Sequence, residues 1–224
     1  MSWEAFYNGA VHHPLQLWAV AAAATLYAAT RRDLDPGLRR YCVGLGLLSG
    51  LDAWLTATAP YGIGPLSGAA ASAVPLFFVL AGDFRYLLLA LAATPDGRLP
   101  LSTRQLAMAA AWTCLVPLGS QLTLSALPDS LSSSRVLFLV YELAFFGLAA
   151  SLASRHPNLQ RARWLRDVSR FVMLYYGLWA AADAFLLVTG SDLGFALRLV
   201  PNLLYYGGLI AAIAWLAPRR DPPA

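Results

Sequence analysis

The sequence alternates long apolar runs with short polar connections. Apolar runs of about 17–25 residues have the length that crosses the hydrocarbon core of a bilayer as a helix. Such runs predict seven helices, over residues 14–30, 40–58, 70–93, 105–126, 135–154, 168–189 and 194–217. We therefore expect an all-α fold, a single seven-helix transmembrane domain that spans residues 1–224.

The connections between these runs fall into two sets that differ in charge. The first set is rich in arginine and reads "RRDLDPGLRR", "TPDGRLPLSTR", "SRHPNLQRARWLR" and the tail "APRRDPPA". The second set, "TAPYGIGPLSG", "PDSLSSSR" and "TGSDLG", has a single arginine. Because cytoplasmic loops are enriched in basic residues, this pattern predicts an N-terminus outside and a C-terminus in the cytoplasm. The expected location is the inner (cytoplasmic) membrane, which the chain crosses several times.

Composition excludes several classes of protein. Hydrophobic residues make up 58% of the chain and charged residues 12%, whereas soluble domains carry about 25% charged residues. The net charge of +4 would suggest nucleic acid in a soluble domain, but here the arginines flank apolar runs, so we expect membrane lipids and no nucleic acid as partners. There is no lysine, which excludes Schiff-base chemistry and a retinal opsin.

Residues with metal-binding or redox chemistry are few and scattered. Cys42 and Cys114 fall at different depths of their predicted helices, so we expect no disulfide between them. His12 and His13 precede the first helix, and His156 lies in a basic connection, without cysteines or acids at ligand spacing. We therefore expect neither a metal site nor a cofactor.

Two segments indicate a faint internal repeat. "LLSGLDAWLTA" and "GLWAAADAFLLV" share an Asp-Ala-aromatic-Leu core, and each precedes a Val-Pro step, at Pro75 and at Pro201. This predicts two parallel repeats, 14–93 and 135–217, around the linker helix 105–126. The 3+1+3 topology resembles that of the SWEET-type transporters, although their Pro-Gln signature is absent. The alternative is chance similarity between helices rich in Ala and Leu.

Six charged residues lie more than three positions from either end of the predicted helices, where an ionised group costs about 2.5–3.5 kcal/mol. They are Asp52, Asp83, Arg85, Glu142, Asp183 and Arg198. Asp183 lies about six residues before its helix ends, and Arg198 about five residues after the next helix begins, which places both at nearly the same depth. We therefore predict an ion pair between Asp183 and Arg198.

Polar and aromatic residues form stripes on the last two predicted helices. Tyr176, Trp179 and Asp183 share one helix face, and Arg198, Asn202 and Tyr205 share a face of the next. Together with Asp52 and Glu142 they form the predicted binding residues of one cavity open to the outside. Three acids against one base leave two acids to be protonated in part, which suits proton-coupled binding. The alternative is that these residues only hold the helices together.

Asp83 and Arg85 lie in the inner half of the third predicted helix. Because they are two positions apart, they point to different faces and should not pair directly. We expect Arg85 to extend toward the cytoplasmic headgroups.

Several motifs resemble the lysoplasmalogenase (YhhN-like) family of membrane hydrolases. They are Gly82-Asp83, Asp183 within "ADAFLL", and "RLVPNLLYYGGLIA". The resemblance implies that Asp83 and Asp183 are paired catalytic carboxylates, an acid and a base that activate water on a vinyl-ether lysolipid. The family has eight helices, a Ser-Asp where this chain has Ala182-Asp183, and a His-Tyr motif that this chain lacks. The predicted depths of the two carboxylates also differ by roughly 10 Å.

The sequence thus favours binding or transport of a small molecule, coupled to a proton, through an outward-facing polar pocket. An ether-lipid hydrolase is the second hypothesis, and a structural or sensory membrane protein without catalysis is the third.

Overall fold

The computed structural model describes residues 2–9, 12, 17–57, 62–64, 66–128 and 133–220. These residues form helices and no strands, which confirms the all-α prediction. The elements are α1 (Trp3–Tyr7), α2 (Leu17–Thr30), α3 (Pro36–Thr56), α4 (Ala70–Ala92), α5 (Thr103–Ser125), α6 (Ser134–Arg155), α7 (Pro157–Arg161), α8 (Arg163–Thr189), α9 (Leu193–Leu197), α10 (Leu199–Leu203), the π-helical turn η3 (Leu204–Gly208) and α11 (Leu209–Leu216).

Among the described residues, five helical stretches are long and apolar enough to cross a membrane. They are α4, α5, α6, α8 and the run from Leu193 to Leu216 that joins α9 to α11. The helix α2 is apolar but has 14 residues, and α3 has 21 residues, of which three are charged. The predicted start of the first helix, residue 14, lies outside the described residues. These lengths and compositions indicate a multi-pass membrane protein.

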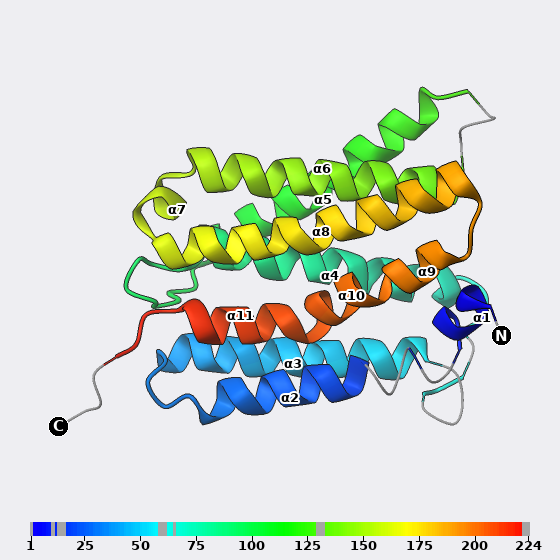
Figure 1. Ribbon diagram of the computed structural model, residues 1–224. Coiled ribbons are helices and arrows are strands. Elements are labelled where there is room, and N and C mark those ends of the chain that lie inside the picture. Colours follow the sequence, from blue (N-terminus) through cyan, green and yellow to red (C-terminus); the bar gives the residue numbers. More distant parts are fainter. Residues whose placement is uncertain are drawn as a thin grey trace.

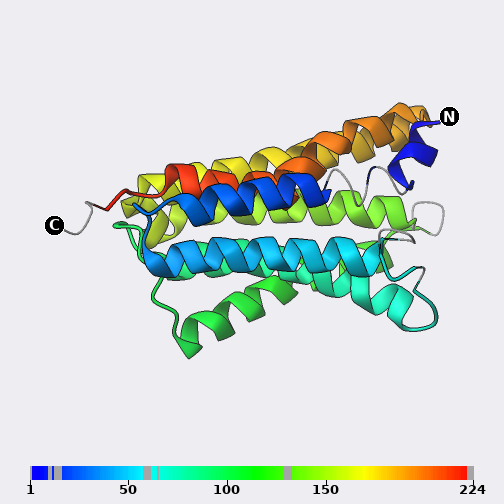
Figure 2. The same cartoon turned by 90° about the horizontal axis from the view of Figure 1, so that it is seen from below.

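The long helices lie side by side along one axis (Figures 1 and 2). The pairs α2–α3 and α6–α8 pack closely, and α11 lies between them in contact with both α2 and α8. The helix α5 packs on α4 and α6 at the periphery and crosses the bundle obliquely (Figure 2). A buried apolar core runs through the bundle, with Tyr86, Phe145 and Tyr175 among its largest side chains.

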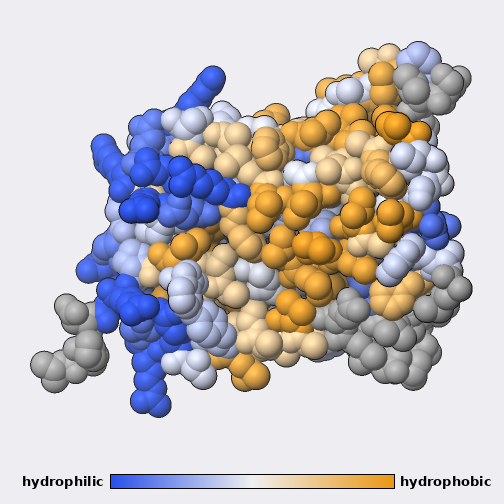
Figure 3. All heavy atoms as spheres, in the orientation of Figure 1, coloured by the Kyte–Doolittle hydropathy of each residue, from blue (hydrophilic) through white to orange (hydrophobic). Residues whose placement is uncertain are grey.

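Hydrophilic side chains gather at one end of the bundle, and apolar side chains cover its flank (Figure 3). At this end lie the α2–α3, α4–α5 and α6–α8 connections and the end of α11 (Figure 1). The arginine-rich connections of the sequence therefore meet in one layer. The short helix α1 lies at the opposite end.

The basic connection before α8 is more helical than predicted. We expected a loop up to residue 167, but α7 occupies Pro157–Arg161 and α8 begins at Arg163. The reason is tertiary contact: Leu159 is fully buried, and the Trp164 indole N–H donates to the Thr94 carbonyl at 3.2 Å. Arginine, glutamine and leucine also favour helix, so this basic segment becomes helical once Leu159 and Trp164 are buried.

The last predicted helix, 194–217, is interrupted rather than continuous. It breaks at Arg198 between α9 and α10, and the turn η3 widens it at Leu204–Gly208. Pro201 has no N–H to continue the helical hydrogen bonding, which accounts for irregularity at this level. At η3 the backbone approaches α2 so closely that a Cβ on Gly207 would lie 2.2 Å from the Val20 side chain.

Asp35 begins α3 and links it to the C-terminal segment. Its Oδ1 accepts from the backbone N–H groups of Gly37 at 2.9 Å and Leu38 at 3.1 Å, and its carboxylate pairs with Arg220. We expect Asp35→Ala to lower the free energy of unfolding by about 1 kcal/mol, because an N-cap is lost.

Thermal unfolding in detergent can be followed in a Cys114→Ala background with a thiol-reactive dye, since Cys42 is fully buried and not disulfide-bonded. Asp96→Ala is the matched control, because Asp96 is an exposed acid that pairs with Arg98 at 2.8 Å. Such an exposed pair contributes less than about 1 kcal/mol. If Asp35→Ala and Asp96→Ala lower the unfolding temperature equally, the N-cap does not contribute more to stability than an exposed ion pair.

Candidate functional site

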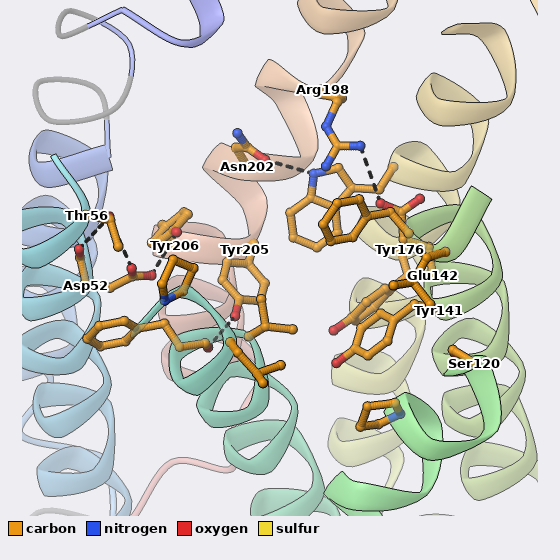
Figure 4. Close-up of a pocket in the computed structure, with 18 of the residues that line it drawn as sticks. Asp52, Thr56, Ser120, Tyr141, Glu142, Tyr176, Arg198, Asn202, Tyr205 and Tyr206 are labelled. Carbon is orange, nitrogen blue, oxygen red and sulfur yellow. Dashed lines mark hydrogen bonds and ion pairs between the residues drawn. The ribbon is translucent and has the colours of Figure 1, made fainter. Parts of the chain in front are cut away.

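A cavity of about 690 Å³ lies in the half of the bundle away from the arginine-rich end. Its walls come from α3, α4, α5, α6, α8 and the α10–η3 segment, and Tyr7 of α1 and Leu17 of α2 also border it. The polar and aromatic side chains in its wall include Asp52, Thr56, Ser120, Gln121, Tyr141, Glu142, Tyr176, Trp179, Arg198, Asn202, Tyr205 and Tyr206 (Figure 4).

Most residues that we predicted to form a pocket line this cavity. Those in its wall are Asp52, Glu142, Tyr176, Trp179, Arg198, Asn202 and Tyr205. Asp183 lies behind the wall, fully buried and in contact with Arg198. The two stripes also meet directly, because the Trp179 indole N–H donates to Asn202 Oδ1 at 2.8 Å.

The predicted ion pair between Asp183 and Arg198 is confirmed. It belongs to a larger cluster, in which Arg198 Nη1 lies 3.6 Å from Glu142 Oε1 and Arg135 Nη1 lies 3.2 Å from Asp183 Oδ1. Two buried acids and two partly exposed arginines thus neutralise one another. Sequence reasoning missed Arg135, which we assigned to a connection. Arg135 ends that connection and is also the first residue of the fifth predicted helix, at the same end of the bundle as Asp183, and this position was the available signal.

Asp52 occupies the opposite side of the cavity from Glu142 (Figure 4). Its Oδ2 accepts from the Tyr206 hydroxyl at 2.8 Å, and Thr56 Oγ1 lies 3.4 Å from Oδ1. Within the described part of the chain, no ion pair reaches Asp52. Hydroxyl groups therefore solvate this acid without neutralising its charge.

Asp83 and Asp183, the carboxylates that the hydrolase resemblance pairs, have different partners. Asp83 is almost fully buried and accepts from the hydroxyls of Tyr141 and Tyr176. Asp183 is bound by Arg135 and Arg198. Among the described residues, neither carboxylate borders the cavity, and no hydrogen bond or ion pair joins them.

Our prediction that Arg85 reaches the headgroups is wrong. Arg85 is 3% exposed, and its Nη2 donates to the Tyr205 backbone carbonyl at 2.6 Å. The guanidinium also lies 4.0 Å from the centroid of the Tyr205 ring. The carbonyl and the ring face together offset the cost of burying the charge, which removes the reason to extend toward water.

Gly82 allows Tyr205 to occupy the centre of the site. A Cβ at this position would lie 1.6 Å from the Tyr205 hydroxyl oxygen. We expect Gly82→Ala to displace Tyr205 and lower the free energy of unfolding by about 1–3 kcal/mol, as overpacking does in other cores.

Gly147→Ala, in α6, is the matched control for Gly82→Ala. A Cβ at Gly147 would meet no atom within 4 Å, so this change should be neutral or raise stability, because alanine favours helix over glycine. Both variants can be compared by thermal unfolding in the same detergent. A Gly82→Ala protein as stable as Gly147→Ala would contradict the packing argument.

Within the described residues, two polar atoms in the cavity wall lack hydrogen-bond partners. They are Glu142 Oε2 and Ser120 Oγ, whose residues are 4% and 1% exposed. Buried polar atoms in folded proteins are nearly always satisfied by protein, water or ligand. A metal site has no support from the arrangement of ligands: within the described ranges, no three His, Cys, Asp or Glu side chains lie close enough together to hold an ion.

The fold and the cavity define an α-helical, multi-pass membrane protein with a charged internal cavity. No protein-family model matches the chain, and no match was found among the curated proteins or the solved structures.

Proposed function

We propose that this chain is a seven-helix protein of the inner membrane that binds or transports a small molecule through the cavity, coupled to a proton. The N-terminus is outside and the C-terminus in the cytoplasm, which the layer of arginine-rich connections supports. The observation that carries the proposal is Glu142, a buried acid in the cavity wall with an unpartnered Oε2. The proposal includes the two three-helix repeats predicted for residues 14–93 and 135–217.

The balance of charge supports the coupling to a proton. The buried acids around the cavity are Asp52, Asp83, Glu142 and Asp183, and the arginines are Arg85, Arg135 and Arg198. One acid is in excess, four against three. A bound proton or a cationic ligand would neutralise it, and the exchange of one for the other is the simplest form of coupling.

Access to the cavity tests the proposal. A cysteine replacing Ser72, an exposed residue in the cavity wall, should react in intact cells with a membrane-impermeant, cationic thiosulfonate reagent, in a Cys114→Ser background. Ser154→Cys is the control, because this exposed residue lies near the arginine-rich end of α6. It should react only after permeabilisation. The opposite pattern would overturn the orientation, and no reaction at Ser72→Cys would overturn an outward-facing cavity.

The same chemistry separates transport from binding. Ser120→Cys places the thiol deeper in the cavity wall, at a buried position. A transporter should expose this thiol to the impermeant reagent both in intact cells and in inside-out vesicles, because its cavity opens alternately to each side. A protein that only binds should react from the outside alone.

A lysoplasmalogenase-like hydrolase is the second candidate. The observation that favours it is that Tyr141 and Tyr176 line the cavity and connect it to Asp83 by their hydroxyls. Purified protein would then release aldehyde from a 1-alkenyl lysophospholipid, and Asp83→Asn would abolish that release. Absence of aldehyde release from well-folded protein would remove this candidate.

A further inference from the structure

The cavity has an apolar wall that continues onto the flank of the bundle. Leu76 of α4 and Phe138 of α6 line the cavity and are also 53% and 46% exposed. Next to Leu76, Phe77 is exposed as well. The C-terminal half of α5 also lines the cavity, and its end diverges from the other helices (Figure 1). In a membrane, exposed apolar side chains on a helix face lipid, so the wall offers a path for an acyl or alkyl chain.

The polar side of the cavity offers acceptors and few free donors. The hydroxyls of Tyr141 and Tyr176 donate to Asp83, and the Trp179 indole N–H donates to Asn202. The Tyr206 hydroxyl donates to Asp52. The donors in the wall are thus largely occupied by protein acceptors, which leaves the cavity suited to a ligand that brings N–H or O–H groups.

Two unpartnered atoms lie on the same side of this cavity. Glu142 Oε2 and Ser120 Oγ come from the neighbouring helices α6 and α5, and Figure 4 shows both residues on the side away from Asp52. Arg198 lies near the other carboxylate oxygen, Oε1, at 3.6 Å. A donor group that contacts Oε2 therefore completes the coordination of Glu142 without displacing the arginine.

The net charge around the cavity is negative whether only the wall residues or also the charged residues behind them are counted. The wall itself holds Asp52 and Glu142 against Arg198. Adding the buried Asp183 with its second partner Arg135, or Asp83 with Arg85, adds one acid and one base each time. One negative charge remains in excess in every case, which favours a ligand with a single positive charge.

From these four features we infer that the ligand is a single-chain amphiphile with a protonated amine head group. Its N–H groups donate to Glu142 Oε2 and Ser120 Oγ, and its alkyl chain lies along Leu76 and Phe138. It enters sideways from the outer leaflet. This assignment names the substrate class of the cavity and rests on the proposed function.

Binding of tritiated dodecylamine tests the inference. The protein is reconstituted in phosphatidylcholine nanodiscs, and the signal from empty nanodiscs is subtracted to remove partitioning into lipid. We expect saturable binding that unlabelled dodecylamine displaces at least tenfold more effectively than dodecyltrimethylammonium, dodecanol or dodecanoate. The first competitor is a cation without N–H, the second is uncharged, and the third is an anion.

Variants locate the head group. Glu142→Gln should weaken dodecylamine binding about tenfold, because a charge-assisted hydrogen bond is lost. Ser120→Ala should weaken it a few fold, and this small change keeps the test valid should Glu142→Gln not fold. Asp96→Asn, an exposed acid outside the cavity wall, is the control and should bind as the unaltered chain does.

The outcomes separate this inference from the proposed function. Equal displacement by the quaternary ammonium or by dodecanol overturns the assignment of an N–H cation. The absence of saturable dodecylamine binding also overturns it, and if Ser120→Cys still reacts with the impermeant reagent, the proposed small-molecule cavity stands. If the thiol does not react either, the proposed function fails too.

Discussion

Asp183→Leu should be among the most destabilising single changes in this protein, with a loss of about 3–5 kcal/mol in the free energy of unfolding. Asp183 is fully buried and binds both Arg198 and Arg135. Removing it leaves the partly buried Arg198 with weaker contacts, to Glu142 at 3.6 Å and to the Tyr7 hydroxyl at 3.3 Å. Breaking one side of a buried ion pair typically has a cost of this size. Unfolding in mixed micelles of dodecyl maltoside and SDS, followed by circular dichroism, measures it.

The double variant Asp183→Leu/Arg198→Met separates a structural role of this pair from a functional one. Apolar residues in place of both partners remove one acid and one base together and leave only Glu142 and Arg135, so much of the lost stability should return. If the cluster only holds α8 to the α9–α10 segment, the double variant will be folded and will keep whatever binding the cavity has. Restored stability with lost dodecylamine binding would assign Arg198 to the site. A single variant as stable as the unaltered chain would show that Asp183 is not ionised against Arg198.

The sequence predicted the all-helical fold and the Asp183–Arg198 pair because both depend on local information. Apolar runs of membrane length determine where helices lie, and counting residues from a shared turn places two charges at one depth. The residues around the cavity followed from the same counting, since polar stripes on neighbouring helices tend to face each other. Asp52 is an example: its depth and helix face predicted a position in the outer half.

The errors concern residues whose surroundings come from distant parts of the chain. Arg85 is retained in the interior by the carbonyl and the ring of Tyr205, 120 positions away. That carbonyl belongs to η3, a π-helical turn with no apolar pattern of its own. The short helix α7 likewise depends on the burial of Leu159. The hydrophobic periodicity of the sequence carries no information on these contacts. A prediction from the depth of Arg85 in its helix alone therefore placed its side chain at the headgroups.

Asp83→Leu is the second change with a large expected effect, a loss of roughly 2–5 kcal/mol. Asp83 accepts hydrogen bonds from the hydroxyls of Tyr141 and Tyr176 and is 1% exposed. Leucine would leave two hydroxyl donors without their acceptor, and each buried donor left unsatisfied costs about 1–3 kcal/mol. It would also remove one acid from the interior around Arg85. The same SDS titration measures the change.

Asp83→Asn distinguishes the hydrogen bonds from the charge. Its side-chain oxygen can accept from one tyrosine, and its amide can donate to the other hydroxyl, so the local network is largely kept. If hydrogen bonding dominates, Asp83→Asn will recover most of the stability lost in Asp83→Leu. If both variants lose equally, the negative charge of Asp83 itself balances Arg85. Asp83 is then an ionised member of the acids around the cavity. A bound cation in that case balances the net negative charge of all these interior groups, and not that of Glu142 alone.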